Sequence, residues 1–243
     1  MAGCVTIRRV SIDGIVLVHG GYHGAWCWDA VVRLLDQRVV AVDLPGRGRR
    51  PSNGQRVTLD ACVDAVLADA DSAGIVRFLL VGHSLGGLTI TSTANRAADR
   101  VAHLVYLAAL APAPGKALFD VYFPETGVPD DVDPTGTQPL MSEEMAHRMF
   151  SADLSDADFA VAHARCVPEP TGLFMASVSG YGSGVGATYV RCTRDEAVPP
   201  AMADGMIANL HPVGVRDLDS DHDAMLSHPG EVAALLNEVA AAL

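Results

Sequence analysis

Short apolar runs that alternate with segments of helical periodicity constrain the fold of this chain more than any other feature. A run that is apolar throughout and only a few residues long is typical of a strand buried on both faces. Because helical segments separate most of these runs, the strands are expected to lie parallel in a doubly wound α/β sheet. The six runs cover residues 14–18, 39–42, 77–81, 101–107, 187–191 and 213–218.

The helical segments between the runs carry apolar residues at spacings of three and four. Helices are expected over residues 25–35, from residue 59 to a stop at Gly74, over 85–97 and 201–210, and in a closing segment with Pro229 near its start.

The alternation breaks between residues 112 and 185. This stretch is rich in Pro, Gly, Asp and Met, with helical patterns only near 142–150 and 155–166. We therefore predict one α/β core domain from residues 1–111 and 186–243, with an inserted helical lid at 112–185.

Composition excludes several classes of function. A net charge of −12 repels a polyanion, and Arg47, Arg49 and Arg50 form too short a basic cluster to follow a phosphate backbone. No apolar run approaches the length of a membrane span, and no glycine loop of the nucleotide-binding type feeds a helix. The chain is predicted to bind neither nucleic acid nor membrane and to need no metal or other cofactor.

The cysteines bear on the compartment. They are odd in number, scattered and never paired as C-x-x-C, which indicates neither a disulfide framework nor a zinc site and favours a reducing, cytoplasmic environment. They are Cys4, Cys27, Cys62, Cys166 and Cys192.

Residues 82–86 read Gly-His-Ser-Leu-Gly, the G-x-S-x-G pattern of a nucleophile elbow. The pattern is short enough to occur by chance, and an ordinary glycine-rich turn is the alternative. A predicted buried strand before Ser84 and a predicted helix after it supply the context that the elbow requires. Ser84 is therefore the candidate nucleophile.

A serine hydroxyl needs a histidine to take its proton and an acid to orient that histidine. His222 and Asp195 follow two predicted strands, at the sheet edge where Ser84 emerges, and they keep the chain order of Ser, acid and His that this elbow fold uses. The competing carboxylates are Glu196, Asp219, Asp221 and Asp223.

The tetrahedral intermediate of acyl transfer needs two backbone N–H groups aimed at its oxyanion. The residue after the nucleophile is Leu85, and the loop after the first strand offers Gly21 within His19-Gly20-Gly21-Tyr22. Those glycines are equally able to serve a tight turn alone.

Taken with these residues, the string HGAWCW at 23–28, the DLPG at 43–46 and the VPEP at 167–170 resemble the α/β-hydrolase superfamily. Within it, the chain looks most like the branch of plant methylesterases, hydroxynitrile lyases and pyrethroid-hydrolase-like carboxylesterases. The resemblance implies the α/β-hydrolase fold and hydrolysis of a small-molecule ester through an acyl-enzyme, without a cofactor.

Two other functions are compatible with the same resemblance. Hydroxynitrile lyases of this branch have a lysine after the catalytic histidine and a threonine in the oxyanion loop, where this chain has Asp223 and Gly20. An anionic Asp223 would oppose the stabilisation of cyanide, which argues against a lyase. Some receptors share the fold but many have lost triad members, whereas all three candidates are present here.

Substrate contacts are expected from the glycine loop, the elbow and the inner face of the lid, although lid Met and Phe residues commonly serve only as core. The oligomeric state is open, with a homodimer possible. The candidate contacts are Gly20, Tyr22, His83, Met145, Met149, Phe150 and Phe174.

Overall fold

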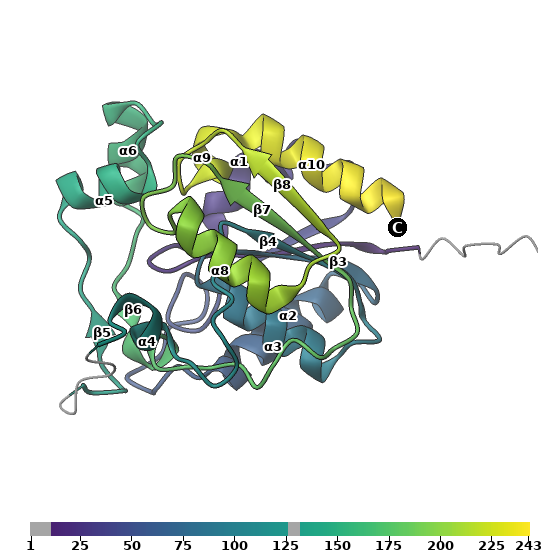
Figure 1. The fold of residues 1–243 in the computed structure, drawn as a ribbon, viewed down its shortest axis with the longest axis horizontal. Coiled ribbons are helices and arrows are strands. Elements are labelled where there is room, and N and C mark those ends of the chain that lie inside the picture. The colour runs from purple at the N-terminus through teal and green to yellow at the C-terminus, as the bar shows by residue number, and fades with distance from the viewer. Residues whose placement is uncertain (1–10, 126–131) are drawn as a thin grey trace, which may run out of the picture.

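A six-stranded parallel sheet lies at the centre of the computed structural model, which describes residues 11–125 and 132–243 (Figure 1). Its order β2-β1-β3-β4-β7-β8 is that of a doubly wound sheet, and every neighbouring pair is parallel, as predicted. The strands are β1 (Gly14–Val18), β2 (Val39–Val42), β3 (Phe78–His83), β4 (Val101–Leu107), β7 (Ala187–Cys192) and β8 (Gly214–Leu218).

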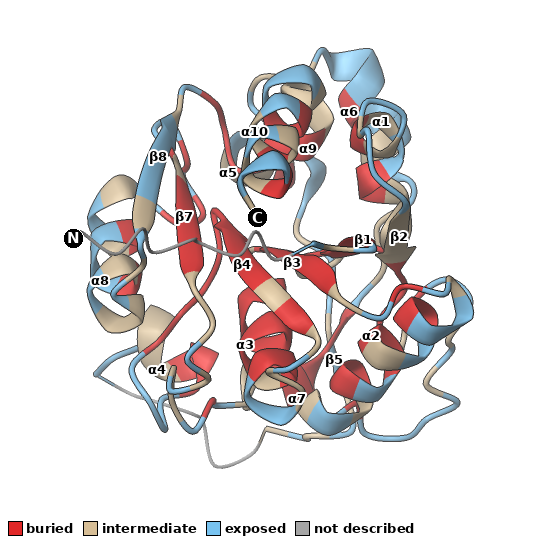
Figure 2. Cartoon of the chain, turned by 90° about the vertical axis from the view of Figure 1, so that its right-hand side faces the viewer, coloured by how far each residue is buried: buried red, intermediate tan, exposed pale blue. Residues whose placement is uncertain are grey.

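The strands are apolar throughout because most are covered on both faces. Along β1, Ile15 and Leu17 pack into one hydrophobic cluster, while Val16 and Val18 pack into the cluster on the opposite face. Figure 2 shows the inner strands buried and the edge strand β8 largely exposed. This burial explains why apolar runs, and not polar-apolar alternation, marked the strands.

Helices cover both faces of the sheet (Figure 1). Together with the strands, α2, α3 and α8 build one hydrophobic cluster, and η1, α1, α9 and α10 build the other. The first three are α2 (Leu59–Ser72), α3 (Gly86–Arg96) and α8 (Pro200–Leu210), and the second group is η1 (Ala25–Trp28), α1 (Asp29–Val32), α9 (Ala224–Ser227) and α10 (Pro229–Ala242). No helix within the two described ranges has the length and apolar character to cross a membrane.

Two predicted boundaries need correction. The helix expected over 25–35 is a 3₁₀ turn followed by a single α turn that ends at Val32. Leu34 beyond it is 49% exposed, and the N–H groups of Leu34 and Leu35 donate to carbonyls only three residues back, so the chain leaves the helix in tight turns. Strand β3 runs on to His83 instead of ending at residue 81, which brings the strand directly to the nucleophile elbow.

The insertion between β4 and β7 contains more structure than predicted. Its two predicted helices are present, and Ser142 and Ser155 cap them by accepting the N–H groups of Met145 and Asp158. In Figure 1 much of the insertion lies beyond the arrowheads of β7 and β8, at the carboxyl edge of the sheet. Its elements are α4 (Leu118–Tyr122), β5 (Thr137–Gln138), α5 (Glu143–Phe150), α6 (Asp156–His163), β6 (Glu169–Pro170) and α7 (Thr171–Phe174), with β5 and β6 antiparallel.

Candidate active site

Ser84 occupies a strained turn between β3 and α3. Its φ of 49° lies in the left-handed region, which is costly for a residue with a side chain. The turn is held because the Ser84 carbonyl accepts the N–H groups of Gly87 at 3.0 Å and Leu110 at 2.9 Å. A Cβ at Gly86 would lie 2.7 Å from the carbonyl oxygen of His19, so only glycine fits this side of the elbow.

His222 and Asp195 meet in the loops that follow β8 and β7. Nδ1 of His222 lies 2.7 Å from Oδ2 of Asp195, and both side chains are buried. The other carboxylate oxygen, Oδ1, accepts the N–H groups of Ala197 at 2.8 Å and Val198 at 2.7 Å. With Nδ1 donating to a carboxylate, Nε2 is left as the acceptor nitrogen of neutral His222.

The electrostatics of His222 follow from this pairing. Burial by itself lowers the pKa of His222, but the charge and the hydrogen bond of Asp195 outweigh burial and raise the pKa above its ordinary value of 6.5. The carboxylate therefore favours the imidazolium form that a proton-accepting base must reach.

The four competing carboxylates are engaged elsewhere. Glu196 pairs with Arg148 at the surface, Asp219 pairs with Arg194, and Asp221 accepts the hydroxyl of Ser227. Asp223 pairs with His23, which leaves Asp195 as the carboxylate hydrogen-bonded to the ring of His222.

Ser84 and His222 face a common cavity of about 270 Å³. Among the residues that the structure describes, no hydrogen bond joins the Ser84 hydroxyl to the His222 ring. Such bonds are often long in unliganded sites and tighten once substrate is bound.

The glycine loop lies directly against Ser84. A Cβ at Gly20 would come within 2.8 Å of the Cβ of Ser84, so the backbone can approach only without a side chain there. Within the described chain, the N–H groups of Gly21 and Leu85 have no acceptor in the protein, which is the condition required of oxyanion donors.

The lining of the cavity agrees with most of the predicted contacts but not with all. Tyr22, His83, Met149, Phe150 and Phe174 line it, together with Met141 from the insertion that also carries Met149. The structure does not bring Gly20 or Met145 to the lining: Gly20 is packed behind the elbow, and Met145 is 39% exposed on the outer side of α5.

Sequence reasoning missed a wall of the cavity that comes from α4. Four of its side chains, or those directly after it, form this wall: Leu118, Phe119, Tyr122 and Phe123. The only signal was a short cluster of aromatic residues in a segment without periodicity, too short to identify a helix.

His83 contacts His222 more closely than it contacts the cavity. It is 1% exposed, its Nε2 lies 3.0 Å from the backbone carbonyl of His222, and the two rings are 4.6 Å apart. Burial and the neighbouring His222 lower the pKa of His83 to about 3, so this ring is neutral and donates from Nε2.

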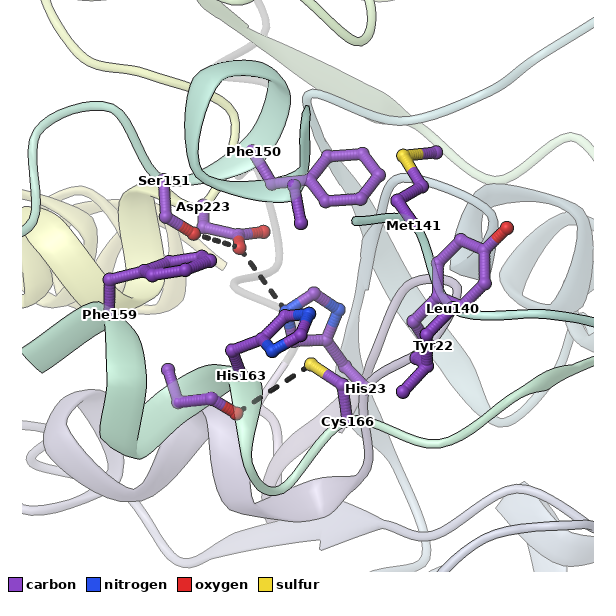
Figure 3. A pocket seen from close by; sticks show the side chains of 12 residues that line it. Tyr22, His23, Leu140, Met141, Phe150, Ser151, Phe159, His163, Cys166 and Asp223 are labelled. Carbon is purple, nitrogen blue, oxygen red and sulfur yellow. Dashed lines mark hydrogen bonds and ion pairs between the residues drawn. The ribbon is translucent and has the colours of Figure 1, made fainter. Parts of the chain in front are cut away.

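A second, smaller cavity adjoins the first and shares Tyr22, His23 and Phe150 with it (Figure 3). Asp223 lines this smaller cavity and not the main one. Its carboxylate is paired with Nε2 of His23 at 3.2 Å, and the expectation that its charge opposes the stabilisation of cyanide stays a prediction.

The insertion is hydrogen-bonded to the chain on both sides of His222. The carbonyl of Phe150 accepts the N–H of Asp223 at 2.8 Å, and the hydroxyl of Ser151 donates to its carboxylate at 2.8 Å. On the other side, Asp153 and Asp221 exchange backbone N–H and carboxylate contacts at 2.9 and 3.1 Å.

Two His/Asp groups in the described chain have potential ligand atoms within 4.8 Å of one another. In the group that adjoins the site, His83 donates to the carbonyl of His222, and Asp223 accepts from Ser151 and pairs with His23. These contacts describe a hydrogen-bond network and offer no preformed open metal position.

Comparison with known proteins agrees with this fold. The model of the "Alpha/beta hydrolase family" matches residues 15–235. Methylesterase 10 of Arabidopsis thaliana is 30% identical over 265 residues, covering 97% of this chain and 94% of the relative. A crystal structure of an Arabidopsis methylesterase has a TM-score of 0.78 at 26% identity, covering 94% of this chain and all of the other. A pyrethroid hydrolase from Sphingobium faniae has a TM-score of 0.78 at 27% identity, covering 94% and 97%.

Proposed function

The chain belongs to the alpha/beta hydrolase family, and from this premise we propose that it is a serine carboxylesterase for small, largely apolar esters. The observation that carries the proposal is the placement of Ser84, on its strained elbow, in the same cavity as a His222 whose Nδ1 is held by Asp195. Ser84 is then the nucleophile, His222 the general base and Asp195 the residue that orients it.

In the acylation half, Nε2 of His222 takes the proton of the Ser84 hydroxyl as Oγ bonds to the ester carbonyl carbon. The carbonyl oxygen becomes an oxyanion that accepts the N–H groups of Gly21 and Leu85. When the tetrahedral intermediate collapses, the bond to the leaving alkoxy group breaks and His222 returns the proton to it. The alcohol departs and the acyl group stays on Ser84.

In the deacylation half, a water molecule takes the place of the alcohol. His222 accepts a proton from this water as its oxygen bonds to the acyl carbon, and the same two N–H groups hold the second oxyanion. Collapse releases the carboxylic acid and returns the proton to Ser84. The cycle consumes one ester and one water and needs no cofactor.

The main cavity supports a neutral, apolar substrate. Its described lining has no Asp, Glu, Lys or Arg side chain and is dominated by Leu, Met and Phe, and the His23 ring that also lines it is already paired with Asp223. An ionised group would lose its hydration there without gaining a free counter-ion. Two proteins to which the chain is similar are a methylesterase and a pyrethroid hydrolase, which supports a hydrolase that acts on an ester. We further propose that residues 112–185 act as the lid that forms the roof of this cavity.

A fluorophosphonate probe followed by mass spectrometry tests the proposal. We expect one adduct, on Ser84, and sustained turnover of p-nitrophenyl butyrate. Ser84→Ala should abolish both, whereas Ser72→Ala, an exposed serine on α2, should change neither. Labelling at another serine, or a single slow turnover with retained product, would contradict the proposal, the latter favouring a ligand-sensing role.

A further inference from the structure

Both polar atoms of the peptide bond between Gly21 and Tyr22 are held by buried side chains. The carbonyl oxygen of Gly21 lies 2.6 Å from Nδ1 of His23, which donates to it. The N–H of Tyr22 donates to Oε2 of Glu169 at 2.7 Å. The orientation of this one peptide is therefore fixed from two sides, by the glycine loop itself and by β6.

Each of these two anchors is one half of a buried ion pair. Glu169 pairs with Arg47, and the two side chains are 0% and 1% exposed. His23 pairs through Nε2 with Oδ2 of Asp223 at 3.2 Å, with side-chain exposures of 5% and 2% (Figure 3). Burying four charged groups within one loop environment is costly, and well-packed apolar residues often serve stability as well or better.

The contacts of His23 fix its charge. Nδ1 faces a carbonyl oxygen and Nε2 faces a carboxylate, so both nitrogens act as donors and the ring is an imidazolium. Burial lowers the pKa of His23, but the Asp223 carboxylate outweighs burial and raises the pKa above its ordinary value. Asp223 thus keeps His23 in the only form that can hold the Gly21 carbonyl and the carboxylate together.

The anchored peptide is under strain. Tyr22 has a φ of 63°, a left-handed conformation that costs free energy for a residue other than glycine and persists only where the surroundings impose it. Without the anchors, φ of Tyr22 could relax from this conformation. The anchors fix the peptide on one side of the Gly21 α-carbon and the Gly21 N–H lies on its other side, so a shift of that α-carbon would change the direction of the N–H.

We propose that Arg47–Glu169 and His23–Asp223 are positioning pairs that hold the Gly21 N–H toward the oxyanion of the transition state. The inference rests on the proposed serine esterase function and goes beyond it, because none of the four residues belongs to the triad or supplies an oxyanion donor. Preorganised donors act mainly on the transition state, so these pairs affect kcat much more than KM.

The decisive variant is the double replacement Arg47→Leu with Glu169→Leu, which removes the anchor of Tyr22 without leaving an unpaired buried charge. We expect kcat for p-nitrophenyl butyrate to fall about 100-fold, as for a misplaced oxyanion donor, with KM within threefold. Affinity for a phenylboronic acid, whose Ser84 adduct is tetrahedral, should fall by a similar factor, whereas affinity for the neutral alcohol 1-butanol, which carries no oxyanion, should not change.

The exposed pair of Arg96 and Asp64 supplies the matched control. Arg96→Gln with Asp64→Asn should leave kcat, KM and boronate affinity within twofold of the parent. A folded Arg47/Glu169 double variant with unchanged kcat and boronate affinity would overturn the inference.

If that double variant does not fold, Asp223→Asn tests the inference. The asparagine keeps the shape of the Asp223 side chain and an acceptor for Ser151. It removes the charge that keeps His23 protonated. A loss of at least about tenfold in kcat and boronate affinity, without loss of 1-butanol affinity, supports the inference; equal losses in all three contradict it. Failure of the parent protein to turn over the ester would instead refute the esterase proposal itself.

Discussion

The carboxylate of Asp195 lies 2.7 Å from Nδ1 of His222, and its second oxygen is held by two backbone N–H groups of its own loop. The loop thus holds the Asp195 carboxylate independently of its contact with His222. The contact between Asp195 and His222 is therefore the most directly testable one of the site.

Asp195→Asn should lower kcat by about 10⁴, or roughly 5 kcal/mol of transition-state stabilisation, with little change in KM or thermal stability. The amide oxygen can still accept the N–H groups of Ala197 and Val198, which turns the NH₂ toward Nδ1 and imposes the wrong tautomer on His222. Steady-state kinetics with p-nitrophenyl butyrate would measure the effect. Glu196→Gln, at an exposed pair with Arg148, is the control; an inactive Glu196→Gln beside an active Asp195→Asn would reverse the assignment.

Activity and stability should depend on pH in opposite directions above pH 6.5. His222 must be neutral to take the proton of Ser84, and its pKa is raised, so kcat/KM should climb with pH through a midpoint above 6.5. The raised pKa also means that protonated His222 stabilises the fold fully below the unfolded value of 6.5, and that this contribution is lost as pH rises through the folded pKa. His23 acts on stability in the same sense.

A pH series of kcat/KM and of thermal midpoints would test this opposition. In Asp195→Asn the residual activity should have its midpoint at lower pH, because the partner that raises the pKa of His222 is gone. A midpoint that did not move would mean that another group controls the rate.

Met149 and Met145 lie on the same helix, α5, so the replacement of one serves as the control for the replacement of the other. Met149 lines the main cavity and Met145 faces outward. Met149→Ala should change the ratio of kcat/KM for p-nitrophenyl octanoate and acetate by about tenfold, since it opens space against the acyl chain. Met145→Ala should leave that ratio unchanged, and an equal effect of both would show that α5 does not present Met149 to the substrate.

Replacement of two glycines by alanine should change the free energy of unfolding in opposite directions. A Cβ at Gly87 would lie 2.2 Å from the carbonyl oxygen of Leu110, so Gly87→Ala should lower the free energy of unfolding by about 1–3 kcal/mol or more. Gly205 is exposed within α8 and its Cβ would meet nothing within 4 Å, so Gly205→Ala should raise it by about 0.5–1 kcal/mol. Urea denaturation measures both, and destabilisation of Gly205→Ala would contradict this description of α8.

The core of the fold was predictable because it depends on patterns local to each segment. Apolar runs located every strand of the central sheet to within two residues, since burial on both faces removes polar residues from them. The 3₁₀ turn at Ala25–Trp28 was predicted as part of a helix because apolar spacing alone does not separate one tight turn from a longer α-helix. The short α4 was missed because one turn is too short to show a period.

The site was predictable in its chemistry but only partly in its surroundings. The order of Ser84, Asp195 and His222 and their positions after strands were readable from the sequence, and the structure brings the last two into contact. Glu169 was noticed only as part of a motif, because the contact of its carboxylate with Tyr22 spans 147 positions. The wrong placement of Met145 has a similar cause: helical spacing does not say which side of α5 faces the cavity.

The contacts that join residues 150–153 of the insertion to the two neighbours of His222 have an evolutionary consequence. Ser151 and Asp153 on one side, and Asp221 and Asp223 on the other, exchange donors and acceptors, so a replacement on either side leaves a buried or half-buried partner unmatched. These four positions are expected to covary among homologues and to be inherited as a unit. Homologues whose insertions diverge to accept other substrates can then vary the α4 side chains that line the cavity. Residues 150–153 are expected to change only together with Asp221 and Asp223.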